Sequence, residues 1–130
     1  MERKNIATGT PWEPIVGYSR AVRLGQASTF QALRLRTRPE RLWAWATPTH
    51  RPQALRNIEA ALRAAGASLK DVLRTRLYVT NIADWEKVGR AHGEVFGEIR
   101  PATSMVEVSR LIAPEMLVEI EADAVISPPG

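Results

Sequence analysis

Apolar residues recur with the period of a helix in residues 53–65 of the chain. Four of them fall three or four positions apart and give the segment one apolar face: Leu55, Ile58, Leu62 and Ala65. Pro52 stands where a helix begins, and Gly66 stands where a C-terminal cap is expected. The pattern predicts an amphipathic helix over residues 53–65.

A second segment, residues 85–97, has the same period. Asp84 precedes it and is a residue type that caps helix N-termini. The apolar face of this segment consists of Trp85, Val88, His92, Val95 and Phe96. We therefore predict a second helix, with His92 as a histidine held in the core or at an interface rather than a catalytic one.

Strand patterns fill much of the remaining chain. The predicted strands are residues 15–24, 29–36, 41–47, 72–80, 103–109 and 117–126. The second and third flank a turn at Pro39 and predict a hairpin. In residues 72–80 one face carries Leu73, Thr75, Leu77 and Val79. In residues 117–126 the alternating apolar positions are Val118, Ile120, Ala122, Ala124 and Ile126.

The order of these elements is several strands, a helix, a strand, a helix and two strands. Such an order predicts an α+β sandwich in which one mixed β-sheet carries two helices on one face. A chain of 130 residues forms one domain, residues 1–130. Strands with apolar residues on both sides need cover on both faces, so we expect other copies of the chain to cover the second face.

The composition excludes several kinds of site. The chain has no cysteine, which excludes disulfides, a thiolate nucleophile and cysteine-ligated metals. Its two histidines are separated and suggest no metal site. No apolar run reaches the length of a membrane span, and no signal peptide opens the sequence. We therefore expect a cytoplasmic protein with no membrane partner and no bound metal.

The net charge of +4 and the pI near 10.1 suggest a nucleic-acid partner at first sight. The charge is confined to one segment, however. Residues 27–53 hold five arginines and one acid, Glu40, which gives +4, the charge of the whole chain. The rest of the chain is neutral, and this distribution argues against nucleic-acid binding.

Three stretches resemble the Rid/YjgF family, the reactive-intermediate deaminases that are often named L-PSP endoribonucleases. They are GYSRAVRLG at 17–25, QALRNIEAALRAAGASLKDVLRTRLYVTNIADWEKVGRAHGEVFG at 53–97, and PATSMVEVSRLIAPEMLVEIEADAVI at 101–126. The third stretch is the most specific, because it contains the elements PA-x-S-x-VEV and VEIEA.

The resemblance implies a homotrimer with a chorismate-mutase-like fold and a ligand cleft between neighbouring subunits. Active members hydrolyse 2-imino or enamine acids to 2-keto acids and ammonia without a cofactor. By the same resemblance, Glu119 is the catalytic acid, base or water-holding group, and Tyr18 lines the cleft for a small-molecule ligand. From the residues alone, Glu119 is equally a solvated strand carboxylate, and Tyr18 is equally a packing residue at an interface. Ser104 is a candidate donor to a ligand oxygen, or it bonds its own backbone neighbours.

The chain departs from the family where active members bind the substrate carboxylate. Those members carry PA-R-S/T, and this chain carries Pro101, Ala102, Thr103 and Ser104. Threonine lacks the permanent charge and the bidentate fork of arginine. Arg100 lies on the other side of Pro101 and is poorly placed to substitute. We therefore expect weak or no deamination of ordinary amino-acid imines.

Residues 27–52 also depart from the family, whose members carry a VSG strand and a turn of the form G-x-VVG-x-GD-x-x-AQT there. Regrouping the codons of this segment permits H-V-S-G from Thr29 and forces glycine at both Trp-Ala pairs, 43–44 and 45–46. The family frame resumes near Pro52. We infer two compensating frame shifts, in the gene or in its recorded sequence. An unusual but genuine hairpin is the alternative.

Three functions follow from the sequence, in order of preference. The first is a trimer that binds a small organic acid or an imine or enamine metabolite between subunits, with Glu119 assisting water in any hydrolysis. The second is a non-enzymatic ligand-binding or regulatory trimer, which Thr103 favours. The third is an endoribonuclease, which ranks last because the sequence offers no histidine pair at a shared site and no basic face outside residues 27–52.

Overall fold

The computed structural model describes residues 1–7, 9–31, 53–114 and 116–126. In chain order, the helices and strands are β1 (Arg3–Ile6), α1 (Trp12–Val16), β2 (Ala21–Leu24), β3 (Ala27–Gln31), α3 (Gln53–Ala64), β4 (Val72–Val79), α4 (Trp85–Phe96), β5 (Ala102–Glu107) and β6 (Val118–Val125). Two short 3-10 turns, η1 (Leu69–Asp71) and η2 (Ile82–Asp84), precede β4 and α4. Both predicted helices and the last three predicted strands are confirmed within a few residues.

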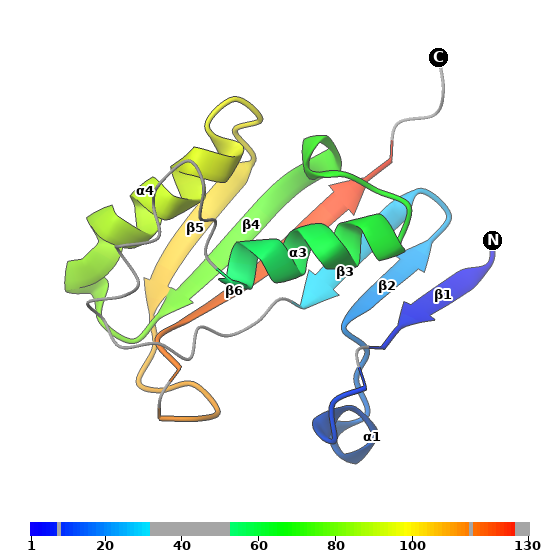
Figure 1. Cartoon of the computed structure of the whole chain (residues 1–130), viewed down its shortest axis with the longest axis horizontal. Coiled ribbons are helices and arrows are strands. Elements are labelled where there is room, and N and C mark those ends of the chain that lie inside the picture. The colour runs from blue at the N-terminus through cyan, green and yellow to red at the C-terminus, as the bar shows by residue number, and fades with distance from the viewer. Residues whose placement is uncertain (8, 32–52, 115, 127–130) are drawn as a thin grey trace.

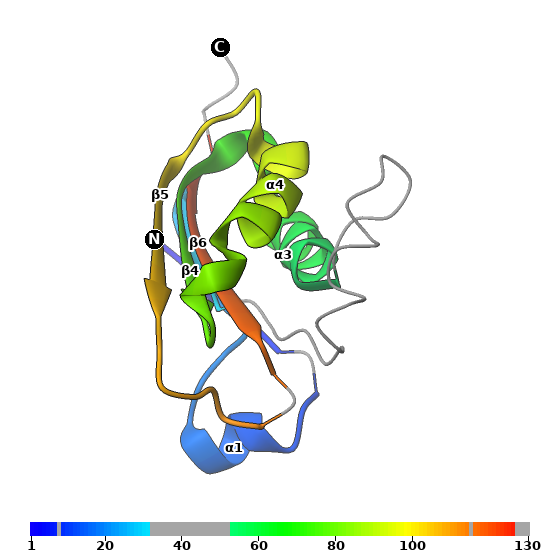
Figure 2. The ribbon, with the colours of Figure 1, turned by 90° about the vertical axis from the view of Figure 1, so that its left-hand side faces the viewer.

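A six-stranded sheet has the strand order β1-β2-β3-β6-β4-β5. Strands β4 and β5 are parallel and the other neighbours are antiparallel, so the sheet is mixed. Figure 1 and Figure 2 show α3 and α4 on the same face of this sheet, with α1 beyond the end where β2 begins. This is the α+β sandwich that the sequence patterns predict, and it agrees with the chorismate-mutase-like fold that the family resemblance implies.

The hydrophobic core lies between the sheet and the two long helices. Helix α3 and the residue after it contribute four residues that are each at most 2% exposed: Leu55, Ile58, Leu62 and Ala65. Strand β6 buries its alternating residues Val118, Ile120, Ala122 and Ala124. Gly66 follows α3 with φ of 80°, and the Ala67 amide donates to the Leu62 carbonyl at 2.8 Å, as in a Schellman cap. In α3 and β6 the helical and strand periods therefore predict the buried residues correctly.

The segment 15–24, predicted as one strand, divides into the end of α1 and the strand β2. Gly17 marks the division, because its φ of 80° ends the helix in a conformation that glycine adopts without strain. Its amide donates to the Glu13 carbonyl at 2.9 Å. The sequence pattern does not predict β1, which pairs antiparallel with β2.

A β-bulge near the start of β4 changes which side chains face the core. The pairing with β6 shifts between Val72 and Arg74. As a result, Val72 is buried, whereas Leu73, predicted on the core face, is 58% exposed. After the bulge the predicted alternation holds, and the buried residues are Thr75, Leu77 and Val79.

The start of α4 also differs from the prediction. Asp84 makes no side-chain capping hydrogen bond. Instead, the Asn81 side chain accepts a hydrogen bond from the Ala83 amide at 3.1 Å and begins the η2 turn. Trp85 is 59% exposed, so the apolar face of α4 begins at Val88.

Most of the predicted hairpin cannot be compared with the structure. Only residues 29–31 belong to the described part, as the end of β3, which pairs with β2 and β6. The remainder of residues 29–36 and 41–47 lies outside the described residues, as do His50 and most of the segment assigned to the frame shift.

The bulge separates two leucines of β4 and predicts different costs for their truncation. Leu77→Ala removes a side chain that is 1% exposed, and we expect the free energy of unfolding to fall by about 2–5 kcal/mol. Leu73→Ala removes an exposed side chain, and we expect a change within about 0.5 kcal/mol. Urea denaturation of both variants measures the difference. Equal losses would show that Leu73 packs as Leu77 does, contrary to the bulge.

Candidate functional site

Thr103, where the chain departs from the family pattern, lies on the edge strand β5. In the parallel pairing of β4 and β5, Thr103 lies opposite Thr75. Paired residues on neighbouring strands point to the same face, so both hydroxyls lie on the helix-covered side of the sheet. Thr75 is completely buried and Thr103 is exposed. Their Oγ1 atoms are 2.8 Å apart.

A chain of hydrogen bonds runs from α4 to the backbone before β5. His92 Nε2 lies 2.8 Å from Thr75 Oγ1, and Thr103 Oγ1 donates to the Pro101 carbonyl at 3.1 Å. Each hydroxyl has a single proton to donate. Because Thr103 donates to Pro101, Thr75 donates to Thr103, and His92 donates from Nε2 to Thr75. Every group in this hydrogen-bond chain finds its partner within one copy of the protein, and none of these groups is charged.

His92 is half-buried on α4, between the helix and the sheet. Burial lowers the pKa of His92 below the value of about 6.5 for an exposed imidazole. The centre of its ring lies 4.7 Å from that of Phe96. A neutral imidazole agrees with the single donating nitrogen in the hydrogen-bond chain. His92 is a packed and hydrogen-bonded histidine, as the helical pattern predicts.

The opposite face of β4, β5 and β6 is polar at its centre, whereas the strand patterns predicted apolar residues on both sides. Arg76 Nη1 lies 3.1 Å from Asp123 Oδ2, in an ion pair whose side chains are each somewhat more than one third exposed. Arg74 Nη2 donates to Ser104 Oγ at 3.2 Å. Pairs as exposed as these add little to stability, but they hold the side chains in place.

Tyr78 and Glu119 also lie on this polar face, opposite each other on β4 and β6. Burial raises the pKa of Tyr78, and the Glu121 carboxylate raises it further through its charge and by accepting a hydrogen bond from the phenol. Tyr78 therefore keeps its proton at neutral pH. Glu119 is half-buried and has partners of its own.

Tyr18 follows α1 and lies next to the start of β2. Its hydroxyl lies 3.4 Å from Thr10 Oγ1, and the guanidinium carbon of Arg20 lies 5.8 Å from the centre of its ring. Strands β2 and β5 are four strand spacings apart in the sheet, roughly 20 Å. Tyr18 and Thr103 therefore belong to opposite sides of the molecule.

The four residues assigned to the site from the sequence do not meet within one copy. Ser104 and Glu119 lie on the polar face, whereas Thr103 lies on the helix-covered face. Glu119 pairs with a residue three positions along β4 from Thr75, which adds about 10 Å along the strands. Tyr18 lies beyond the far side of the sheet. Any site that uses all four needs more than one copy of the chain.

Sequence reasoning identified Thr75 only as a core-face residue and missed its link to Thr103. The available signal was a hydroxyl among the buried residues of VLRTRLYV, because a buried polar group needs a hydrogen-bond partner. Arg100, the alternative cation, is exposed and has φ of 55° in the turn before β5. Among the described residues, no three His, Cys, Asp or Glu side chains lie close enough to hold a metal. Nor is any described helix long and apolar enough to cross a membrane.

The sequence profile of the family described as Endoribonuclease L-PSP matches residues 10–126. This chain belongs to that family, Rid/YjgF. The matched range of this Rid/YjgF chain includes Tyr18, Thr103, Ser104 and Glu119, the residues to which the resemblance draws attention.

Known Rid/YjgF relatives and a solved structure agree with the assignment. A RutC family protein of Pyrococcus abyssi is 35% identical over 126 residues, 95% of this chain and 98% of that protein. A RutC family protein of Pyrococcus horikoshii is 47% identical over 72 residues, and the match spans 55% of this chain and 56% of that protein. A protein of Acinetobacter baylyi named 3-aminoacrylate deaminase RutC is 37% identical over 70 residues, 54% of this chain and 55% of that protein. A crystal structure from Mycobacterium tuberculosis, of a member of the YjgF/YER057c/UK114 family, has a TM-score of 0.83 and 47% identity over 96% of this chain and 100% of that chain.

The lowered pKa of His92 makes stability depend on pH in a defined direction. The folded protein binds a proton at His92 less readily than the unfolded chain does, so protonation favours unfolding. This contribution is fully present above the unfolded-state pKa, about 6.5, and is lost as the pH falls below it. We expect His92→Gln, which keeps a donor for Thr75, to lose less stability than the parent between about pH 7.5 and pH 5. Urea denaturation at the two pH values measures this, and equal losses in both proteins would contradict it.

Proposed function

We propose that this Rid/YjgF protein binds a small organic acid, or an imine or enamine metabolite, in a cleft between neighbouring copies. The name of the Acinetobacter baylyi relative supports the ligand class, because 3-aminoacrylate is an enamine acid. The observation that carries the proposal is the uncharged hydrogen-bond chain that ends at Thr103. It offers a ligand hydroxyl oxygens but no cation, so hydrolysis of ordinary 2-imino acids is weak or absent.

The absence of an arginine charge at position 103 determines how much slower hydrolysis should be. An arginine at this position would hold a carboxylate through two charge-assisted hydrogen bonds. Removing one partner of a buried charged pair costs about 2–5 kcal/mol, which corresponds to about 30-fold to 5,000-fold in rate. Thr103 has one hydroxyl proton, and that proton goes to the Pro101 carbonyl. A ligand carboxylate therefore has to compete with a backbone acceptor.

A cleft between copies explains how Tyr18 and Thr103 serve one ligand. The two residues lie at opposite sides of a sheet and cannot meet in one copy. In a head-to-tail arrangement the β5 edge of one copy lies against the β2 side of the next, which brings the two residues together. Head-to-tail contacts close into a ring when the rotation between copies adds up to a full turn, and otherwise they form an open filament. The homotrimer expected from the family is such a ring.

The surface of a single copy supports association. Five of the six residues of the edge strand β5 are exposed, and an uncovered strand edge readily packs against another chain. Three large apolar side chains on the polar face of the sheet are also exposed: Leu24, Val106 and Val125. Covering them would contribute about 25 cal/mol for each Å² of apolar surface removed from water.

We assign to Glu119 the role of assisting the water molecule that attacks the ligand. A carboxylate accepts a proton from water, or holds the water by hydrogen bonds. Glu119 lies opposite Tyr78, whose pKa is raised and whose hydroxyl keeps its proton. Because the phenol donates this proton to Glu121, the strand pair presents the carboxylate and phenol oxygens as acceptors on the same face.

A non-enzymatic ligand-binding or regulatory role is the second candidate. The absence of charge at Thr103 favours it, because a protein that only binds has no need to stabilise a transition state. The endoribonuclease activity in the family's description ranks third. His92 is the sole histidine among the described residues and is bonded to Thr75, and the chain outside residues 27–53 has no net charge.

Restoring the arginine tests the role of Thr103. We expect Thr103→Arg to raise the rate of ammonia release from freshly generated 2-aminoacrylate by about 30-fold or more. Thr103 is exposed, so a longer side chain has room to extend. Ala102→Arg is the matched control, because it adds the same charge at an exposed position one residue away on the opposite face and should leave the rate unchanged. A parent as active as Thr103→Arg would mean that another group binds the carboxylate. Inactivity of both would favour the ligand-binding role.

Mixed oligomers test whether copies share the cleft. A Tyr18→Ala, Thr103→Arg double variant lacks the tyrosine, and the parent lacks the arginine, so we expect neither to match the activity of Thr103→Arg. When the two are unfolded together and refolded, some clefts take Tyr18 from the parent and arginine from the variant. Random assembly of equal amounts should restore about one quarter of the Thr103→Arg activity. No recovery, with Thr103→Arg itself active, would rule out a cleft shared in this way.

A further inference from the structure

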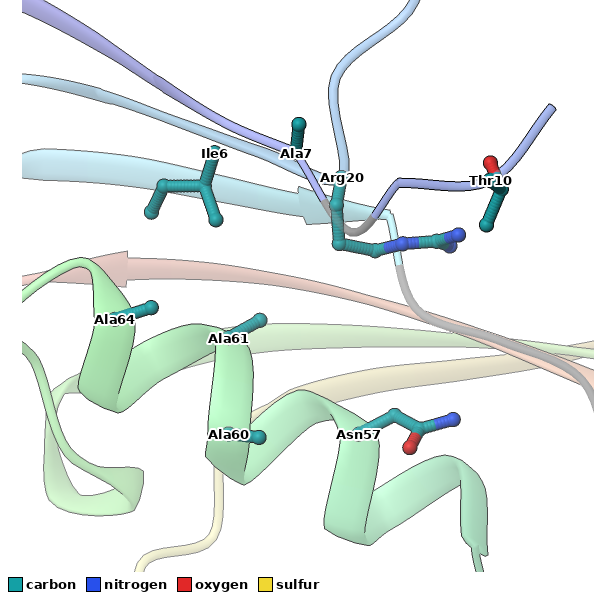
Figure 3. A pocket seen from close by; sticks show the side chains of 8 residues that line it. All are labelled: Ile6, Ala7, Thr10, Arg20, Asn57, Ala60, Ala61 and Ala64. Carbon is teal, nitrogen blue, oxygen red and sulfur yellow. The ribbon is translucent and has the colours of Figure 1, made fainter. Parts of the chain in front are cut away.

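A cavity of about 330 Å³ lies between α3 and the N-terminal segment. Figure 3 shows one face of α3 on one side of it and, on the other side, the end of β1 and residues on either side of α1. The volume is at the lower end of the range of small-molecule sites, about 300–1,000 Å³. Neither Thr103 nor Glu119 lines it.

The two ends of this cavity differ in polarity. Ile6 and Ala64 lie at one end, and the neighbouring wall of α3 is made of alanines (Figure 3). At the other end, the Arg20 side chain extends between Thr10 on one wall and Asn57 on α3. A charged group at one end and methyl groups at the other suit a molecule with an ionic head and a short apolar tail.

Arg20 is 2% exposed, which is rare for a charged side chain. It has partners, including the Tyr18 ring. Its Nη2 atom is buried and makes no hydrogen bond to a described residue. A guanidinium carries five N–H donors in a planar fork that matches a carboxylate. Nη2 is therefore a donor from which an anion in the cavity can accept a hydrogen bond.

Water fits the cavity less well than an amphipathic ligand does. A buried water needs two to four polar partners, and the polar groups of this cavity gather at the Arg20 end. A cationic ligand would meet the charge of Arg20 in a buried place, where repulsion is poorly screened. An anion with an aliphatic tail satisfies both ends.

We propose that this cavity, which neither Thr103 nor Glu119 of the same copy lines, is a second binding site for a small carboxylate with a short aliphatic tail. The carboxylate binds Arg20, with the Thr10 hydroxyl and the Asn57 amide as neutral neighbours, and the tail lies along the alanines of α3. The site lies at the β1–β2 side of the sheet, so its ligand does not touch position 103 of the same copy.

Hexanoate and its uncharged counterpart hexanamide test the proposal directly. Each is titrated into the full chain, and the methyl NMR signals of Ile6 and Ala61 report on occupancy. We expect hexanoate to shift these signals and hexanamide to bind about tenfold more weakly or worse, because the amide loses the charge-assisted hydrogen bonds. The methyl signals report occupancy of the cavity and not turnover, so this test is independent of imine hydrolysis.

Two variants act on different parts of the site. Arg20→Met removes the charge and keeps an apolar stem, and should weaken hexanoate binding about tenfold or more. Ala60→Phe projects a ring into the cavity from an exposed helix position and should abolish binding, even if Arg20→Met does not fold. Arg63→Phe is the matched control, because it adds the same ring to an exposed position of α3 that does not line the cavity.

Three outcomes would overturn the proposal. The first is equal affinity for hexanoate and hexanamide, and the second is no shift of the Ile6 and Ala61 signals at millimolar hexanoate. The third is that Ala60→Phe binds hexanoate as tightly as the parent does, or that Arg63→Phe loses hexanoate binding as well.

Discussion

Strand β4 pairs with β6 on one side and β5 on the other, and its pleat determines which side chains of all three strands share a face. After the bulge, the pleat sends Thr75 and Leu77 to the core and Arg76 and Tyr78 to the opposite face. A register shift of one residue would bury the charged set under the helices, where it would have no partners. The bulge also allows Val72 to be buried, although it lies an odd number of positions from Thr75.

The same alternation divides the candidate chemistry between two faces. Thr103 takes the helix-covered face because it pairs with Thr75, and Ser104 and Glu119 take the polar face. In a central strand such a division would separate the groups completely. Because β5 is an edge strand, a ligand at its rim can approach both Thr103 and Ser104, whereas Glu119 lies on β6, two strands from this edge. A neighbouring copy that packs against this rim would complete the site and cover the exposed edge.

The sequence predicts the elements in which the spacing of apolar residues matches the buried positions directly, as in α3, β6 and the second half of β4. The bulge depends on pairing geometry, so the alternation wrongly assigned Leu73 to the core. The segment RKNI of β1 has no apolar alternation and is a strand because β2 pairs with it. In the site, Thr103 was noticeable only through the family resemblance. Its partner Thr75 is 28 positions away, the partner of Thr75 on α4, His92, is 17 positions from Thr75, and no local pattern links them.

The hydrogen-bond chain also bears on how the fold accommodates different residues at position 103. Thr75 is fully buried and needs both an acceptor and a donor. With threonine at position 103, the bonds run from His92 Nε2 through Thr75 to Thr103 and the Pro101 carbonyl. An arginine there has only donors, so Thr75 would have to accept from it and turn its own proton toward His92. A neutral imidazole allows this, because its proton can move to Nδ1 and leave Nε2 as the acceptor. When the donor direction along these hydrogen bonds reverses, every buried group still has a hydrogen-bond partner. The charge at the β5 rim can therefore change while the core beneath it stays intact.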